Sequence, residues 1–417
     1  MKVCVVGSGG REHAFVKSLS NDSEVVAAPG SGGIEGSTSS PVMEIDADLY
    51  VIGPEVPLVN GLADELRSAG CNVFGPGKSG ARLEASKAWM KDLVHAAGVP
   101  TARYASFDQY QIEEAIEFLI TFEPPYVIKT DGLAAGKGVL VTNSYDDAVM
   151  DIKQKLTGVA FGDAGRRIVI EEGLTGPELS LFALCDGEKA VLIPTSAQDH
   201  KRLLDDDRGP NTGGMGCYSP VPNMSQADLE VLMDIAVHPT VQELKKRDID
   251  YRGVLFAGFI MTPDGPKLLE YNVRFGDPEA QVILPRFENS LSEILLQVAQ
   301  GNLTIQPKVS SDVMVTVVLA SEGYPSSPRT GDVIHGLDEA RAIEGVTVFC
   351  AGVESNVEGE LLTNGGRVLN ICGRAATLDA ARELAYQATN LIFWPGMQHR
   401  TDIGASIERD TNREVKK

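Results

Sequence analysis

VIKTDGLAAGKGV, residues 127–139, places Lys129 in an apolar run and Lys137 in the glycine-rich loop before the next apolar run. The segment is not a P-loop, because three residues rather than four separate its first two glycines and a glycine follows the second lysine. It predicts a strand, a loop and a returning strand that together close over nucleotide phosphates. Lys129 is expected inside this hairpin and Lys137 at its tip. A lone glycine-rich hairpin says little about function, so the interpretation depends on other segments.

LEYNVRFGDPE, residues 269–279, is the most informative of those segments. Side chains alternate along a strand, so Glu270 and Asn272 share one face near the strand's end. A carboxylate and an amide oxygen are hard ligands that suit Mg²⁺ bridging ATP phosphates. Arg274 and Asp277 follow in a turn with Gly and Pro, where substrate-facing side chains are common. The segment predicts a metal–nucleotide site; the alternative is a solvated strand face that holds these residues by chance.

Two further stretches fit a nucleotide site. IVIEEGL, residues 168–174, is an apolar strand that ends in two acids and suits a linker whose backbone reads an adenine edge. Residues 195–202 (TSAQDHKR) and 209–216 (GPNTGGMG) form a long polar stretch, which predicts a functional loop. His200 lies within it, but a lone histidine is more often a structural hydrogen-bonding residue than a catalytic base. His200 therefore receives no general-base role.

GSGGREH, residues 7–13, follows a strand and opens a helix, where backbone N–H groups can hold an anion. A dinucleotide-binding fingerprint is disfavoured, because its third glycine would fall on Glu12. The acidic ribose ligand expected after the second strand is also missing, since that strand runs into Ala28-Pro29-Gly30. A phosphate at this turn is favoured, with Arg11 as a charged contact. The alternative is a tight strand-to-helix turn and nothing more.

The first 100 residues alternate strands and helices, which predicts a parallel sheet with crossover helices. The expected strands are 2–6, 25–28, 49–52 and 72–74, and the expected helices are 11–19, 61–69 and 81–97. Only residues 45–48 separate the apolar pieces near Val42 and Leu49. A parallel crossover needs about a dozen residues. One helix of a regular series is therefore expected to be missing here.

At 417 residues the chain is expected to form two to four domains. Short strands dominate residues 122–187, whereas residues 188–309 and 310–417 mix longer strands with helices. The predicted fold class is α/β and α+β multidomain. It comprises an N-terminal parallel α/β domain (1–100), a core of two subdomains (101–309, divided at about 122–187 and 188–309) and a C-terminal α/β domain (310–417). The polar residues 408–417 predict a frayed end.

Composition narrows the function classes. Thirty-seven Lys and Arg against 58 Asp and Glu give a net charge of -21, which argues against a nucleic-acid partner. No run approaches 18 apolar residues, so no membrane span is expected, and the N-terminus reads as a strand rather than a signal peptide. Six scattered cysteines without a C-x-x-C pair predict free thiols in a reducing compartment. The expected location is the cytoplasm.

Nine segments together resemble the phosphoribosylamine–glycine ligase family of the ATP-grasp superfamily, in the family's order and over nearly the whole chain. They are residues 7–14, 52–62, 86–91, 127–139, 160–172, 196–216, 269–279, 324–332 and 363–369. The resemblance implies an ATP-grasp core, with residues 122–187 as its lid and the N-terminal domain on the phosphoribosylamine side. It also implies that ATP, glycine and 5-phosphoribosylamine give glycinamide ribonucleotide, ADP and phosphate in purine (IMP) biosynthesis. The implied oligomeric state is a monomer or weak dimer.

The resemblance also implies site residues. ATP would be bound by Lys87, Lys129, Lys137, Glu171, Glu172, Leu174 and Glu178, and Mg²⁺ or Mn²⁺ by Glu270 and Asn272. Glycine and phosphoribosylamine would lie near Gly9, Gly10, Arg11, Glu55, Asp199, Arg274 and Asp277, with Lys129 and Arg274 in catalytic roles. Phosphorylation by ATP would turn the glycine carboxylate into glycyl phosphate, so no enzyme nucleophile is needed. Positioning and charge neutralisation would then account for catalysis.

The sequence departs from the family's pattern at two places: the shortened crossover near residue 45, and Phe256-Ala257-Gly258-Phe259, which lacks a further acidic metal ligand. Three other functions stay open. A nicotinamide oxidoreductase would need the missing glycine and acid. A non-catalytic nucleotide-binding module would be expected to lose Lys129, Glu270 or Asn272, all of which are present. A related carboxylase acting on a purine intermediate is disfavoured by the GGREH turn and the QDHKR segment.

Overall fold

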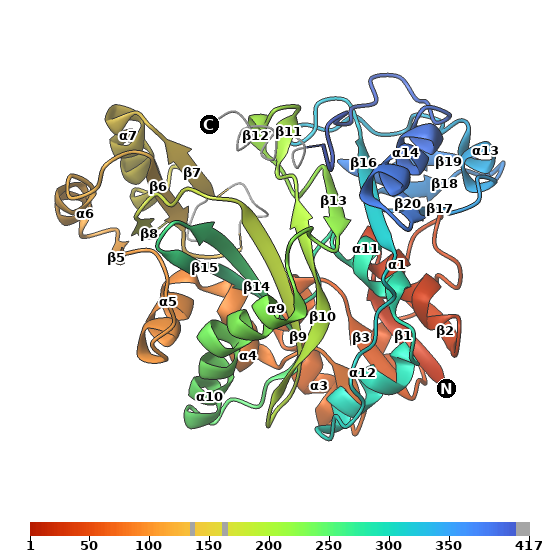
Figure 1. The fold of residues 1–417 in the computed structure, drawn as a ribbon, viewed down its shortest axis with the longest axis horizontal. Coiled ribbons are helices and arrows are strands. Elements are labelled where there is room, and N and C mark those ends of the chain that lie inside the picture. The colour runs from red at the N-terminus through yellow and green to blue at the C-terminus, as the bar shows by residue number, and fades with distance from the viewer. Residues whose placement is uncertain (134–137, 161–165, 406–417) are drawn as a thin grey trace.

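The computed structural model describes residues 1–133, 138–160 and 166–405 (Figure 1). Lys137 and the predicted frayed end at 408–417 lie outside the described residues. Within the described residues, no helix has both the length and the apolar character needed to cross a membrane.

The N-terminal region contains the expected parallel sheet, in the order β2-β1-β3-β4. Its strands are β1 (Lys2–Gly7), β2 (Glu24–Pro29), β3 (Leu49–Ile52) and β4 (Val73–Phe74). Helix α1 (Gly10–Leu19) crosses from β1 to β2. Between β2 and β3 there is only the short 3-10 helix η1 (Val42–Glu44). This confirms the prediction, made from the spacing, that no regular crossover helix lies here.

The helix predicted over residues 81–97 is wrong in one respect, because the chain forms two helices there. They are α4 (Lys78–Ala85) and α5 (Lys87–Ala96), which follow α2 (Glu55–Asn60) and α3 (Leu62–Ser68). Ser86 adopts an extended conformation (φ -134°, ψ 109°) and its hydroxyl accepts the N–H of Trp89. The Asp131 carboxylate, in the glycine-rich loop, accepts the Ser86 hydroxyl at 3.2 Å and the Ala88 N–H at 3.1 Å. Capping at Ser86 breaks the helix and fixes α5 against that loop.

A four-stranded antiparallel sheet of order β5-β8-β6-β7 forms the part of the molecule expected to be the lid. Its strands are β5 (Tyr104–Asp108), β6 (Tyr126–Thr130), β7 (Val139–Thr142) and β8 (Arg167–Glu171). Helices α6 (Ile112–Leu119) and α7 (Tyr145–Leu156) pack on it around Ile128 and Ile170, forming a separate small core. Figure 1 shows this unit projecting from the rest of the molecule at the upper left.

An antiparallel eight-stranded sheet runs through the remainder, in the order β15-β14-β9-β10-β13-β16-β20-β17. Its strands are β9 (Glu178–Asp186), β10 (Ala190–Asp199), β13 (Gly216–Ser219), β14 (Arg252–Thr262), β15 (Gly265–Asn272), β16 (Val313–Ala320), β17 (Val346–Cys350) and β20 (Arg367–Ala375). Because the sheet contains strands from both sides of residue 309, main-chain pairing continues across the expected domain boundary. The domain boundaries stay predictions.

Helices and short strands complete the described chain. They are α9 (Gln226–Leu232), the π-helix η2 (Met233–Val237), α10 (His238–Lys246), α11 (Ala280–Ile283), η3 (Leu284–Arg286), α12 (Leu291–Gln300), α13 (Leu337–Arg341), α14 (Leu378–Thr389), β18 (Val353–Ser355) and β19 (Leu361–Thr363). Two buried apolar clusters each combine residues of the N-terminal sheet, such as Cys4 and Val5, with residues of the large sheet, such as Leu255 and Val254. The N-terminal sheet is thereby fixed against the strands that carry the site.

The polar stretch 195–216 is more ordered than the predicted loop. It continues β10 to Asp199, then forms a hairpin of β11 (Arg202–Leu204) and β12 (Arg208–Asn211), and enters β13. Several of its polar groups are held by the C-terminal part of the chain, which lies far away in sequence: Asp205 by Thr401, Asp207 by Arg400 and the Gly213 carbonyl by Arg367. Local composition could not reveal those partners.

Candidate active site

Glu270 and Asn272 lie near the end of β15, opposite Gly258 and Phe256 of β14. Tyr271, between them, is buried in the core, so the two polar side chains share the other face as the alternation predicted. Burial raises the pKa of Glu270, but Lys201, Lys87 and Lys129 together lower it below its ordinary value. Glu270 is therefore held as a carboxylate among cations.

The same pair is the candidate metal centre. Among the described residues, no group of three or more His, Cys, Asp or Glu is arranged to hold a metal ion. An oxygen pair from one carboxylate and one amide still fits Mg²⁺, which commonly binds one or two protein carboxylates and takes its other ligands from phosphates and water. The donor set thus fits a divalent ion that arrives with a nucleotide.

A buried ion-pair cluster, here called the lid cluster, joins Lys91, Lys129 and Glu171. The Glu171 carboxylate lies 3.0 Å from Lys91 Nζ and 2.9 Å from Lys129 Nζ, and its residue is only 2% exposed. Burial raises the pKa of Glu171, but the two lysines lower it below its ordinary value. Lys91 also donates to the Thr101 hydroxyl at 2.7 Å, and burial lowers its pKa to about 8. Two cations share one carboxylate, which leaves positive charge next to Glu270.

The remaining predicted ATP residues surround this cluster. Lys87 is the first residue of α5 and acts electrostatically on Glu270. Glu172 accepts the Arg103 N–H at 3.3 Å, and Leu174 is partly buried in the segment that follows β8. Glu178, at the start of β9, forms a 2.8 Å ion pair with Lys201. Of this set, Lys137 alone lies outside the described residues.

Asp199 and Glu279, here called the acid pair, form a contrasting group. Burial, and then the negative charge of Glu279, raises the pKa of Asp199 well above its ordinary value. Burial likewise raises the pKa of Glu279, whose carboxylate accepts the Ser180 hydroxyl at 3.3 Å. Lys201 faces both acids and also Glu270. The acid pair therefore places two carboxyl groups that retain protons more readily than usual near Lys201, which also lies near Glu270.

Arg274 lies between two glutamates that come from different helices. Its guanidinium donates to Glu55 at 3.2 Å and to Glu84 at 2.6 Å. Glu84 also accepts the Val273 N–H at 2.9 Å, so it fixes both the side chain and the backbone of this turn. Although burial lowers the pKa of Arg274, the two glutamates raise it well above its ordinary value. Arg274 is thus a permanently charged, pre-positioned group.

The N-terminal turn meets the same region from the other side. Arg11 donates to the Phe275 carbonyl at 3.2 Å and pairs with Glu12 at 2.7 Å. The anion-binding donors at the start of α1 are taken by the chain's own carboxylates: the Gly9 N–H by Glu12 at 2.6 Å and the Arg11 N–H by Asp277 at 3.4 Å. A Cβ on Gly10 would come within 2.4 Å of the Asn370 amide, so close packing demands glycine there.

Five further charged residues lie in the site and had no predicted role: Lys91, Glu84, Lys201, Glu279 and Arg367. Arg367, on β20, donates to the carbonyls of Gly213 and Asp277, each at 2.5 Å, and lies 3.5 Å from the Asp277 carboxylate. All except Glu84 belong to the sequence segments that carried the family resemblance, which was the available signal. Their partners lie too far away in sequence to be inferred by local reasoning.

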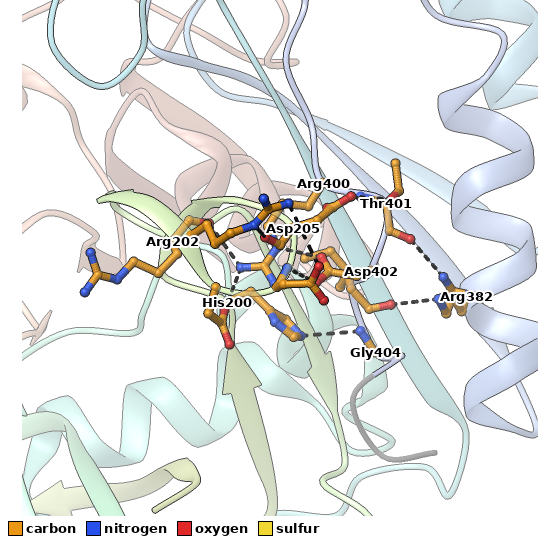
Figure 2. A network of polar contacts seen from close by, with 12 residues as sticks. His200, Arg202, Asp205, Arg382, Arg400, Thr401, Asp402 and Gly404 are labelled. Carbon is orange, nitrogen blue, oxygen red and sulfur yellow. Dashed lines mark hydrogen bonds and ion pairs between the residues drawn. The ribbon is translucent and has the colours of Figure 1, made fainter. Parts of the chain in front are cut away.

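His200 agrees with its interpretation as a structural residue. It is buried, its Nε2 accepts the Gly404 N–H at 3.3 Å, and burial lowers its pKa to about 4 (Figure 2). A neutral imidazole that accepts a backbone hydrogen bond is engaged in holding two segments together.

Comparisons with known proteins agree with this arrangement. Family models for phosphoribosylglycinamide synthetase match residues 1–84 (N domain), 85–280 (ATP-grasp domain) and 314–406 (C domain). A phosphoribosylamine–glycine ligase of Caulobacter vibrioides is 46% identical and covers 97% of this chain and 98% of its own length. One of Streptomyces coelicolor is 44% identical, with 97% and 99% covered. A crystal structure of the Thermotoga maritima phosphoribosylamine–glycine ligase matches with a TM-score of 0.84 and 35% identity, covering 97% of this chain and all of that one.

The ATP-grasp architecture, the full-length similarity and the charged site at the meeting point of the sheets together assign this chain to the phosphoribosylglycinamide synthetase family.

Proposed function

We propose that the protein joins glycine to 5-phosphoribosylamine, with ATP as the energy source, to give glycinamide ribonucleotide, ADP and phosphate. Membership of the family supports this reaction. The observation that carries it is the Glu270–Asn272 pair, an oxygen ligand set surrounded by Lys87, Lys129 and Lys201. A carboxylate that remains ionised among three lysines suits the phosphates and the divalent ion of a nucleotide.

The proposed chemistry has two steps. A glycine carboxylate oxygen attacks the γ-phosphorus of ATP, and ADP leaves, which gives glycyl phosphate. The phosphoribosylamine nitrogen then attacks the acyl carbon, the amine loses a proton, and phosphate departs as a good leaving group. The side chains contribute by orienting the reactants and by stabilising negative charge on the transferred phosphoryl group.

On the ATP side, Lys87, Lys129 and Lys137 are proposed to bind phosphates. Lys129 is held in place by Glu171 within the lid cluster. The segment that holds Glu171, Glu172 and Leu174 is proposed to contact adenine through its backbone, with Glu178 at the ribose. Glu270 and Asn272 would hold Mg²⁺ or Mn²⁺, which supplies charge neutralisation to the phosphates when bound.

On the substrate side, the proposed residues are those that converge between the N-terminal turn and the large sheet: Gly9, Gly10, Arg11, Glu55, Asp199, Arg274 and Asp277. Arg274 is proposed to act catalytically, because its guanidinium is fixed by Glu55 and Glu84 before any ligand binds. The acid pair would favour the amino group of a substrate. We further propose the domain division at residues 100 and 309, a cytoplasmic location, and a monomer or weak dimer.

A coupled assay for ADP, with each substrate omitted in turn, tests the proposal. ADP formation is expected to require both glycine and 5-phosphoribosylamine, and glycinamide ribonucleotide is expected in equal amount. ADP formation that proceeds at the full rate without either substrate would overturn the assignment.

A further inference from the structure

The segment at the end of the described chain, residues 399–405, is here called the C-terminal strap. It is anchored on one side to helix α14. Arg382 donates to the carbonyls of Ile403 at 2.9 Å and Thr401 at 2.8 Å, and the Tyr386 hydroxyl donates to the Arg400 carbonyl at 3.0 Å. Ile403 is fully buried. The strap is therefore a fixed part of the C-terminal region.

On its other side the strap holds the β11–β12 hairpin through Arg400, which is only 1% exposed. The guanidinium forms a two-point ion pair with Asp402, at 2.7 and 2.8 Å. It also donates to the Asp207 carboxylate at 2.8 Å and to the Arg202 carbonyl at 3.1 Å. Figure 2 shows Arg400 and Asp402 of the strap beside Arg202 and Asp205 of the hairpin. A guanidinium with so many fixed acceptors is a rigid connection.

The tip of the hairpin is bound by the same strap. The Asp205 carboxylate accepts the Thr401 N–H at 2.8 Å, and Asp402 accepts the Asp206 N–H at 2.9 Å. Asp206 and Asp207 have φ values of 58° and 50°, a left-handed conformation that is uncommon outside glycine, although Asp adopts it more readily than most residues. Two consecutive residues of this kind persist only where the surroundings hold them. The strap supplies those contacts.

Residues 199–201, which join β10 to the β11–β12 hairpin, link the strap to the site. Neighbouring side chains in an extended chain point to opposite sides. Asp199 and Lys201 face the site, where Lys201 lies near Glu178, Glu270 and Glu279. His200, between them, faces the strap and accepts the Gly404 N–H. The strap therefore contacts one face of this extended segment, through His200, while Asp199 and Lys201 lie on the opposite face.

We propose that Arg400, with the C-terminal strap, is a positioning residue for the ligation reaction, because it holds the hairpin that places Asp199 and Lys201. This inference rests on the proposed function. Small misplacement of a positioned group can cost a large factor in rate. The ATP lysines Lys87 and Lys129 lie on elements that the hydrogen bonds of Arg400 do not reach.

Arg400→Met in the full chain is the principal test, with Arg329→Met as a control for the loss of a paired arginine elsewhere in the C-terminal region. Arg329 also pairs with two carboxylates, Glu322 and Asp332, and donates to a carbonyl, that of Pro395, but those partners lie in the C-terminal region and not in the hairpin. Arg400→Met is expected to lower kcat/KM for glycine by about tenfold or more, while the KM for ATP stays within about twofold. Arg329→Met is expected to behave like the unmodified protein. Equal losses in the two variants, or no loss in a folded Arg400→Met, would overturn the proposal.

Hydrogen exchange in peptides that cover residues 200–212 provides a readout that needs no substrate. Arg400→Met is expected to speed exchange there by about tenfold and to leave the lid strands unchanged. Unchanged exchange in the hairpin overturns the positioning role whatever the reaction is. Absence of glycine-dependent ADP formation in the unmodified protein would instead contradict the proposed function, and the exchange result would then decide the role of the strap.

A second pair of variants keeps the proposal testable if Arg400→Met does not fold. Asp207→Gly removes a partner of Arg400, whereas Asp206→Gly removes a neighbouring carboxylate that lies 3.9 Å from Arg208. Glycine suits the left-handed conformation at both positions, so the turn itself is preserved. Asp207→Gly is expected to lower kcat/KM for glycine about threefold, and Asp206→Gly to leave it unchanged. Equal values for the two variants would count against the strap.

Discussion

The lid cluster and the acid pair are both buried groups of charge, but their charge balance is opposite. In the lid cluster two lysines share the Glu171 carboxylate, and the pKa of that carboxyl is lowered despite burial. In the acid pair, burial raises the pKa values of both carboxyl groups, and the negative charge of Glu279 raises that of Asp199 further. The first group presents two lysine side chains and suits phosphate. The second presents two carboxyl groups whose ionisation is costly, and a substrate amino group would offset that cost. One site thus offers two complementary ends, with Glu270 between them.

Removing the Glu270 carboxylate, which lies between the lid cluster and the acid pair, is expected to have the largest effect on activity. Glu270→Ala should leave the chain folded and lower glycine-dependent ADP formation by roughly a hundred- to a thousandfold, because the metal and phosphates lose a fixed ligand. The measurement is the steady-state rate at saturating Mg²⁺, with circular dichroism as the control for folding. Near-normal activity would remove Glu270 from the metal site.

Breaking the lid cluster is expected to have the next largest effect. Lys91→Met leaves Glu171 with Lys129 as its one remaining lysine partner in this cluster, so Lys129 is held more tightly by the carboxylate and is less available to phosphate. The KM for ATP is expected to rise about tenfold, while the KM for glycine stays within about twofold. Initial rates with each substrate varied in turn measure both constants. If the KM for glycine rose and the KM for ATP did not, Lys91 would act on glycine binding and not on ATP binding.

A change at the N-terminal turn sharpens the comparison on the substrate side. Arg11→Ala removes a guanidinium held by Phe275 and Glu12, and it is expected to raise the KM for phosphoribosylamine about tenfold and much more than that for ATP. Initial rates at varied phosphoribosylamine are the measurement. If the value stays unchanged, Arg11 has no part in the pocket.

The smallest expected effect concerns stability and pH. Because the folded pKa of Asp199 is raised, the folded chain binds this proton more readily than the unfolded chain does. The ionised group therefore costs stability above its folded pKa, and that cost disappears as the pH falls toward about 4. Asp199→Asn should raise Tm at pH 7 by about 1–2 °C and reduce the stability gained on acidification.

Calorimetry at pH 7 and pH 5 checks this, with the exposed Glu24→Gln as a control for the loss of one negative charge. A Tm for Asp199→Asn that matches the unmodified protein at both pH values would argue against repulsion within the acid pair.

The elements that could be predicted from the sequence are those that depend on neighbouring residues. The Glu270–Asn272 strand, the antiparallel pairing of β6 with β7 and the absent helix before β3 follow from alternation, glycine placement and spacing. Ser86 shows where local reasoning stopped: apolar periodicity continues through it, but its N-cap and the Asp131 carboxylate divide the helix. Ser86 is a residue type that favours an N-cap, so this signal could be read from the sequence. The contact with Asp131, 45 residues away, could not.

The sequence predicted which residues belong to the candidate site. It did not predict which of them form ion pairs or hydrogen bonds with one another. Glu84 pairs with Arg274 across 190 residues, and Arg367 reaches Gly213 across 154. Such pairings depend on how the N-terminal sheet, the hairpin and the C-terminal strands meet. Chain-local patterns contain no information about that geometry, which is why the hairpin at 202–211 was expected to be a loop.

Glycine labelled with ¹⁸O in both carboxylate oxygens tests the proposed chemistry most directly. If the carboxylate attacks the γ-phosphorus and phosphate later leaves the acyl carbon, one labelled oxygen must end in the released phosphate and the other in the product amide. Mass spectrometry of inorganic phosphate is therefore expected to find one ¹⁸O for each glycinamide ribonucleotide formed. Unlabelled phosphate, released while glycinamide ribonucleotide accumulates, would contradict a glycyl phosphate intermediate.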